Sequence, residues 1–429
     1  MSDLIKHVVE NAKNGKFDDK NALTLIGSTL SSSEMTDKAD ENGILDLLIE
    51  YMNSPDPETH HDATLLLVHI ALNSTKMMEI IAKKDAVPLF FKNLNSSNKN
   101  ILSTSLMFFN SIVFSHPDLR KYVNEFELVQ HIHIIVESNP SINILEYSLT
   151  VFLSLTQCSN PPLSHEAIKA MLPVFSIFLQ HPHPEIAGNS ALALALITSN
   201  KNSGYMIMFE EEDIQNLIEL LNRRNKQVQI SALRLILYII DNSDHETQVF
   251  IDKGILQSLT KFLKGYDDET VMLALLIVQK LITSSNVQIT TIFNSNIVPL
   301  IAENFISTSS VEVQQVAAII FSNIAINGNE NQVSMIIDMN VIPTFCNLLK
   351  KREHEILIHS SLIAILTLLQ KSENRNCFIF NQLSKCGGFV ALEKLENYET
   401  ANIKKFASSI LSIYEQQSIH GTCQKEVFM

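Results

Sequence analysis

The sequence predicts an all-α solenoid, because one block of about 42 residues recurs nine times along the 429-residue chain. A hydrophobic residue just before a Pro or Gln marks most of the blocks, and successive markers lie 42 to 44 residues apart. The markers are Leu45, Val87, Val129, Leu172, Ile214, Leu256, Val298 and Ile342. A solenoid explains this regularity, since each unit buries its apolar face against its neighbours.

Each block has the apolar spacing of helices. The segment 229–240 is too long for a typical strand and ends in the polar cluster 241–244, which suits a helix end and the cap of the next helix. A short helix at 246–252, a second at 255–263, a polar link and a long third helix then follow. Three helices per block favour the armadillo repeat over the two-helix HEAT repeat. We therefore expect a right-handed superhelical armadillo solenoid of about nine three-helix repeats, with the third helices on the concave side.

The two ends of the chain are less periodic than the middle. Residues 1–40 are expected to supply N-terminal capping helices, at about Asp3–Lys13 and Asp19–Leu30, since an end repeat needs a cover. Residues 41–417 are expected to form the armadillo domain, and the tail 418–429 is expected to fray. The sequence has no run of 18 apolar residues, so it predicts no membrane partner.

Composition and motifs argue against several classes of function. The formal net charge is −14, which favours basic partners and disfavours nucleic acid. The sequence contains no GxGxxG, P-loop or GxSxG motif, so we expect no enzyme and no cofactor. Five Cys without a CxxC pair, and His residues without further ligands at set spacing, indicate reduced thiols and no metal site.

Three groups of short motifs carry a more specific signal. They are Asn160-Pro161-Pro162-Leu163 with Met171–Pro173 and 181–186; Ser231–Arg234 with 245–252; and Lys385–Phe389 with 392–399. In this order and at these repeats they resemble importin-α, the armadillo adaptors that carry proteins with basic nuclear localisation signals. The resemblance covers roughly residues 40 to 417. It implies an adaptor of the cytoplasm and nucleus that binds extended cargo peptides in a concave groove.

The groove positions depart from that family. In importin-α most third helices carry a Trp and, one turn later, an Asn, which would hold lysine side chains and the peptide backbone. This chain has no Trp. The matching pairs are Leu65/His69, Met107/Ser111, Thr150/Ser154, Leu192/Leu196, Arg234/Tyr238, Leu276/Lys280, Ile319/Asn323 and Ile363/Thr367. The resemblance implies a peptide groove that includes His69, Ser111, Ser154, Arg234, Tyr238, Lys280, Asn323 and Thr367, among which only Asn323 keeps the family's Asn.

Two non-enzymatic functions stay open. The first is an import adaptor whose partners are cargo proteins with basic or extended segments. The second is an armadillo scaffold or chaperone-like protein that no longer binds the family's import signals. Importin-β and an export receptor would be further partners of an importin-α. Residues 1–40 contain no Arg and no basic cluster, so we expect no recruitment of importin-β by the family's route.

Overall fold

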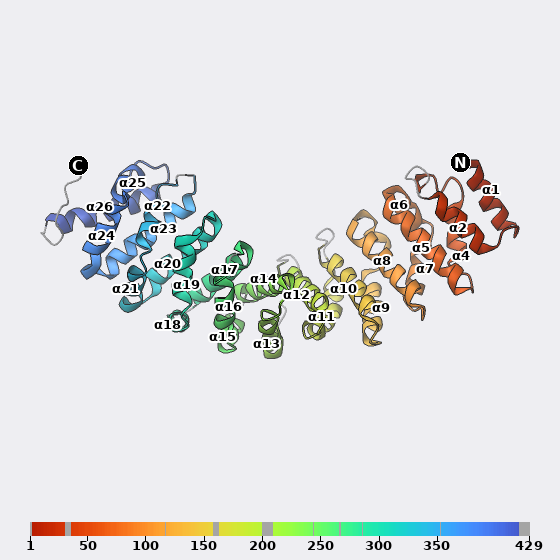
Figure 1. Cartoon of the computed structure of the whole chain (residues 1–429), viewed down its shortest axis with the longest axis horizontal. Helices are drawn as coiled ribbons and strands as arrows, with labels where there is room; N and C mark the ends of the chain where they lie inside the picture. The colour runs from red at the N-terminus through yellow and green to blue at the C-terminus, as the bar shows by residue number, and fades with distance from the viewer. Residues whose placement is uncertain are drawn as a thin grey trace. The chain divides into compact units, whose positions relative to one another are not determined.

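The computed structural model describes residues 2–30, 36–115, 117–157, 163–199, 209–242, 244–265, 267–284, 286–351 and 353–419. Within these ranges the regular secondary structure is entirely helical, which confirms the predicted all-α class. The chain divides into two compact units, Met1–Met208 and Phe209–Met429 (Figure 1). The motif residues 160–162 and the tail from residue 420 lie outside the described residues.

The first unit is a stack of helices in which the long third helices α5, α8, α10 and α12 each pack on the next. Its elements are α1 (Ser2–Lys13), α2 (Asp19–Thr29), α4 (Ile44–Tyr51), α5 (Pro57–Asn73), α6 (Thr75–Lys83), α7 (Ala86–Asn93), α8 (Lys99–Ser115), the 3-10 helix η1 (Pro117–Tyr122), α9 (Glu125–Glu137), α10 (Ile142–Gln157), α11 (His165–Leu179) and α12 (Pro184–Ser199). Helix α2 packs against α5 at the N-terminal end of this stack.

The second unit continues the same pattern, with α14, α17, α20, α23 and α26 as its long third helices. Its elements are α13 (Glu211–Leu220), α14 (Lys226–Asn242), α15 (Asp244–Asp252), α16 (Ile255–Leu263), α17 (Asp268–Ser284), α18 (Asn286–Asn294), α19 (Ile297–Ser307), α20 (Val311–Asn327), α21 (Glu330–Asp338), α22 (Ile342–Leu348), α23 (Glu355–Lys371), η3 (Glu373–Arg375), α24 (Asn376–Lys385), α25 (Gly388–Leu395) and α26 (Ala401–Ile419).

The predicted repeat is present in the structure. Nine long third helices occur in the described part of the chain, from α5 to α26, and their first residues follow the 42-residue spacing closely. The second helix expected at 255–263 coincides with α16, and the long helix expected at 229–240 extends to Lys226–Asn242 in α14. These observations confirm the armadillo solenoid.

A left-handed residue marks the turn between the first and second helix of many repeats. Gly43, Asp85, Gly254, Asn296, Asn340 and Gly387 have φ values of 71°, 55°, 85°, 59°, 57° and 70°. Only Gly, and to a lesser degree Asn and Asp, adopts this backbone conformation at low cost. The recurrence of these residue types at repeat spacing is therefore a local cause of the repeated turn.

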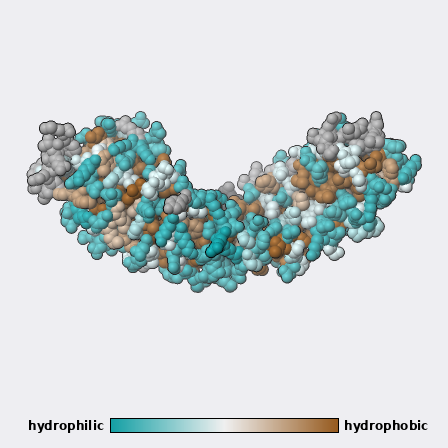
Figure 2. Space-filling view, viewed as in Figure 1, coloured by the Kyte–Doolittle hydropathy of each residue, from teal (hydrophilic) through white to brown (hydrophobic). Residues whose placement is uncertain are grey.

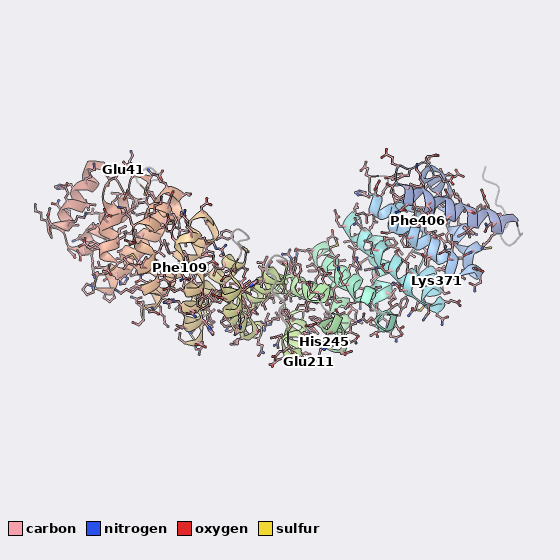
Figure 3. The ribbon with its side chains drawn as sticks, turned by 180° about the vertical axis from the view of Figure 1, so that it is seen from behind. Glu41, Phe109, Glu211, His245, Lys371 and Phe406 are labelled. Carbon is pink, nitrogen blue, oxygen red and sulfur yellow. The ribbon has the colours of Figure 1, made fainter. Side chains whose placement is uncertain are left out.

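Phe side chains supply the aromatic core in a chain that has no Trp. In the first unit Phe90 stacks on Phe108 with ring centroids 3.7 Å apart, and the neighbouring Phe109 is buried beside them (Figure 3). In the second unit the rings of Phe305 and Phe345 lie 5.0 Å apart. The first contact joins the second and third helices of one repeat, and the second joins the second helices of adjacent repeats.

The described cysteines differ in whether their thiols are free or disulfide-bonded. Cys346 is buried and free, Cys386 is half-buried and free, and Cys377 in α24 is disulfide-bonded. The expectation of reduced thiols therefore holds for Cys346 and Cys386 and is wrong for Cys377. Burial raises the pKa of Cys346 to about 12, so this thiol is a poor nucleophile at neutral pH.

Candidate functional site

The solvent-facing side of the third helices is the candidate site, and we call it the third-helix face of each unit. In the first unit it is formed by exposed or half-exposed side chains that recur every three or four residues along each helix. They are Leu65, His69 and Leu72 on α5, Met107, Asn110 and Phe114 on α8, Tyr147 and Thr150 on α10, and Asn189, Leu192 and Leu196 on α12. Residues at this spacing share one side of a helix.

Two of the predicted groove residues are buried. Ser111 and Ser154 point into the packing between helices, and Ser154 Oγ donates a hydrogen bond to Asn110 Oδ1 at 2.6 Å. Asn110, one residue before Ser111, is half-exposed. Asn110 is therefore the polar group that α8 presents on the third-helix face.

The first unit's face carries little charge. Beyond the sixth residue of each helix, α5, α8, α10 and α12 contain no Lys, Arg, Asp or Glu. Two acids border this region. Asp62, the sixth residue of α5, has a side chain that is 44% exposed, and Glu146 on α10 has its Oε1 3.2 Å from Nδ1 of His183, just before α12. An acidic residue available to a lysine of a ligand is thus absent from the described central and C-terminal parts of these four helices.

The second unit's face carries paired charges. Arg234 on α14 lies 3.0 Å from Glu269 on α17, measured from Nη2 to Oε1. Asp241 and Lys280 form a second ion pair between the same two helices. Each cation is half-exposed, and each is neutralised by an acid of the neighbouring third helix. Arg234 and Lys280 thus act as cross-links between repeats in this structure.

Further along this unit the face becomes neutral. Tyr238 on α14, Asn323 and Ile319 on α20, and Thr367 on α23 are half-exposed. Among the described residues the side-chain amide of Asn323 has no hydrogen-bond partner. An amide offers two donors and one acceptor oxygen, which matches the two polar groups of a peptide unit.

The end of α20 is held from the next third helix. Lys371 Nζ, at the end of α23, donates a hydrogen bond of 3.0 Å to the carbonyl oxygen of Gly328 and another to that of Ile326 (Figure 3). Carbonyl groups at a helix C-terminus have no partner within the helix and attract cations. Lys371 therefore stabilises the helix end and is occupied by this role.

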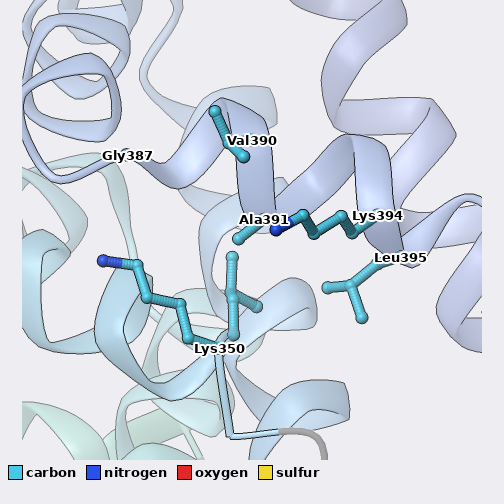
Figure 4. Close-up of a pocket in the computed structure, with 7 residues that line it drawn as sticks. Lys350, Gly387, Val390, Ala391, Lys394 and Leu395 are labelled. Atoms are coloured by element: carbon cyan, nitrogen blue, oxygen red, sulfur yellow. The ribbon is translucent and has the colours of Figure 1, made fainter.

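Among the described residues of the second unit, two hollows lie near the third helices. One, of about 380 Å³, lies between the end of α22 and helix α25, and Lys350 and Lys394 contribute to its walls (Figure 4). Lys350 Nζ donates to the carbonyl oxygen of Cys386 at 2.8 Å. The other, of about 460 Å³, is a shallow groove between α23 and α26, lined in part by Gln370 and Ser412. The second hollow extends the third-helix face toward α26.

The same described residues show neither a metal cluster nor a single membrane-spanning helix. They contain no cluster of three His, Cys, Asp or Glu side chains that could hold a metal ion. They also contain no single helix with the length and hydropathy of a membrane span; only the pair 355–371 and 373–385, bent by 105°, meets those criteria jointly.

Comparison with known proteins finds distant similarity to importin-α subunits. Importin subunit alpha-3 of Arabidopsis thaliana is 24% identical over 226 residues, which cover 52% of this chain and 42% of that protein. Importin subunit alpha-3 of Caenorhabditis elegans is 26% identical over 179 residues, which cover 42% and 35%. The chain is thus similar, at low identity, to importin-α subunits over about half of its length. No family model matches it.

A solved structure shares the fold of this chain. The crystal structure of an engineered protein superposes with a TM-score of 0.74 at 19% identity, and the match covers 96% of this chain and 98% of the other. The matches to the two importin-α relatives above span less than half of each relative's own length. The fold is therefore shared over nearly the whole chain.

Sequence reasoning missed three residues that shape the site. Asn110, Asp241 and Glu269 were not among the predicted groove residues, yet Asn110 lies on the first face and the two acids neutralise Lys280 and Arg234. The spacing of Met107, Asn110 and Phe114 was the signal that could have found Asn110, since residues three, four and seven apart lie on one side of a helix.

Proposed function

We propose that this protein is an armadillo adaptor that binds an extended segment of another protein on its third-helix face, with Tyr238 and Asn323 of the second unit as central contacts. The observation that supports this best is the half-exposed amide of Asn323, which has no partner within the described residues. A polar group left in this state on a solenoid face is available to a ligand.

The physical basis is the recognition of backbone. An extended segment exposes an N–H or a C=O group at every residue, and a side-chain amide can donate to one and accept from the other. Each such bond contributes roughly 1 kcal/mol net. Ile319 and Ile363 flank this region with half-exposed apolar surface that would pack against the ligand's side chains. Thr367 and the exposed part of Lys280, which stays paired with Asp241, complete the proposed contacts at either side of Asn323.

The names of the relatives extend the proposal to cargo transport. Both relatives compared above are importin subunits alpha. We therefore propose that the bound segment belongs to a cargo protein and that the adaptor acts between cytoplasm and nucleus. The proposed ligand-binding part is the armadillo domain, residues 41–417, and residues 1–40 serve as its N-terminal cap.

A second candidate function is an armadillo scaffold that binds no basic import signal. The paired charges favour it, because Asp241 and Glu269 are already engaged by Lys280 and Arg234 and are not free to receive ligand lysines. The absence of Trp acts in the same direction, since no indole ring is available for cation–π contacts.

Peptide binding to two variants tests the proposal. A lysine-rich import peptide and a neutral peptide of equal length are titrated into the full chain, and fluorescence anisotropy gives the dissociation constants. Asn323→Ala should weaken binding by about 1 kcal/mol, whereas His69→Ala, an exposed residue of the first unit, should leave that contact intact. Equal and negligible effects at both positions, with an unchanged melting temperature, would show that the second face is not used in this way.

Preference between the two peptides separates the candidate functions. Tighter binding of the lysine-rich peptide supports the import adaptor. Binding of the neutral peptide alone, weakened by Asn323→Ala, supports the scaffold. If neither peptide binds, the proposed use of the face is wrong.

A further inference from the structure

The third-helix face of the first unit is largely apolar, and beyond the sixth residue of each helix it is uncharged. Leu72 near the end of α5 is 53% exposed, and Phe114, at the matching position of α8, is 57% exposed. Leu65 and Tyr147 are also exposed on this face. Figure 2 shows hydrophobic surface gathered where α5, α6 and α8 lie. Contiguous apolar surface of this kind, as opposed to scattered single residues, marks a binding region.

The charge pattern distinguishes this face from its counterpart in the second unit. Past the sixth residue, the four third helices of the first unit carry no formally charged side chain, while those of the second unit carry Arg234, Asp241, Lys280 and Lys371 among others. Lys, Arg, Asp and Glu make up 18% of the whole chain. The solvent side of a helix is normally where charged residues gather. Their absence here therefore matches a partner that is itself uncharged.

Two side-chain amides interrupt the apolar surface. Asn110 accepts a hydrogen bond from Ser154 through its Oδ1, and its NH₂ group has no partner within the described residues. Asn189 on α12 is half-exposed, and its amide makes no hydrogen bond to the described part of the chain. These amides can bond the backbone of a ligand without selecting a charged side chain.

We propose that the first unit's third-helix face binds an extended, uncharged segment of another protein whose alternate side chains are apolar. The inference rests on the proposed function, since it names the ligand class of a second face of the same adaptor. Packed helices lie about 8–10 Å apart, so four of them span roughly 30 Å. An extended segment rises about 3.3 Å per residue, so about ten residues cover that distance. A lysine placed past the sixth residue of these helices would lose water without gaining an acidic partner on them.

Two soluble peptide pools test this ligand class on the full chain. In the first pool, about ten residues long to match the span above, Leu, Ile, Met, Phe or Tyr alternates with Ser, Thr or Asn. In the second, Lys or Arg replaces every apolar residue. Leu72→Ser and Phe114→Ser remove exposed apolar side chains of the face. Ile177→Ser is the matched control, because Ile177 on α11 is 65% exposed and lies on a second helix of its repeat.

The apolar pool should bind more tightly than the basic pool. Each variant on the face should weaken its binding about fivefold, as expected when half of a Leu or Phe side chain is buried on binding. Ile177→Ser should change it less than twofold, a difference of about 0.4 kcal/mol. Melting temperatures that stay within a few degrees of the unmodified protein show that the substitutions left the fold intact.

The outcomes separate this inference from the function on which it rests. If the basic pool binds better and loses affinity with Phe114→Ser, the ligand class is wrong and the peptide-binding function stands. If the apolar pool responds to Asn323→Ala but to neither variant of the first face, it binds the other unit and the inference is overturned. Concentration-dependent dimerisation that Phe114→Ser abolishes would assign the face to a second copy instead. Binding of neither pool, nor of the peptides used for Asn323, would refute both proposals.

Discussion

The buried ion pair between Arg120 and Glu125 should be one of the strongest local determinants of the first unit's stability. The Arg120 side chain, in η1, is 1% exposed, and its Nε lies 2.6 Å from Oε1 of Glu125 at the start of α9, which is 18% exposed. Glu125→Gln removes the counter-charge and leaves the guanidinium buried. Breaking a buried ion pair in this way lowers the free energy of unfolding by about 3–5 kcal/mol. We expect the lower end of this range, about 3 kcal/mol, because Glu125 is partly exposed and Arg120 has further contacts.

The assay has to report on this unit alone, because long repeat arrays do not always unfold in one step. Hydrogen exchange of the α8 and α9 amides gives the local free energy of opening. Glu127→Gln is the matched control, since Glu127 is exposed in the same first turn of α9 and its loss changes the helix-dipole interaction equally. Replacing both partners, as in Arg120→Met with Glu125→Leu, should restore most of the stability. An effect of Glu125→Gln no larger than that of Glu127→Gln would refute the reasoning.

Three further predictions concern ligand affinity, packing and pH. A single-cluster basic import signal should bind far more weakly than nanomolar, since each missing Trp loses about 0.5–2 kcal/mol of cation–π contact; nanomolar affinity in the anisotropy assay would contradict this. Gly388→Ala should lower the free energy of unfolding by about 1–3 kcal/mol, because a Cβ would lie 2.9 Å from Sγ of Cys346, while Gly27→Ala, with its nearest neighbour at 3.4 Å, should have no such effect. Burial lowers the pKa of His60, so as the pH falls the unfolded chain binds a proton at His60 before the folded chain does. The free energy of unfolding should therefore fall as the pH drops below about 6.5. Denaturant titrations should show a smaller fall in this free energy for His60→Gln.

Periodicity predicted the helices well because the repeat is encoded in local signals. Apolar spacing, polar clusters at helix ends and Gly, Asn or Asp at left-handed turns all recur with the repeat, so α16 occupies the predicted 255–263. The cap proposed for residues 1–40 has the expected helices, with α1 and α2 close to the predicted bounds. Local sequence and tertiary packing agree along these segments, as expected of a minimally frustrated fold.

The orientation of side chains on the third helices was harder to predict. A match by repeat position transfers a residue number but not the rotation of the helix, and one residue of shift turns a side chain by about 100°. This is why Ser111 is buried while Asn110 faces solvent. The ion pair between Arg234 and Glu269 joins residues 35 apart, and only the stacking of α14 on α17 brings them together.

The acidic surplus of the chain is not a guide to its ligand. The acid run 210–213 forms a capping box at the start of α13, where the helix dipole favours negative charge. Within this run Glu211 also forms an ion pair, with its Oε2 2.9 Å from Nζ of Lys253. Burial raises the pKa of Asp213 in this cap, a structural perturbation at a helix end. On the second face the acids Asp241 and Glu269 are neutralised by cations of the neighbouring helices. A net charge of −14 therefore reflects helix capping and a solvated surface, and ligand choice depends on the local amides and apolar side chains of the two third-helix faces.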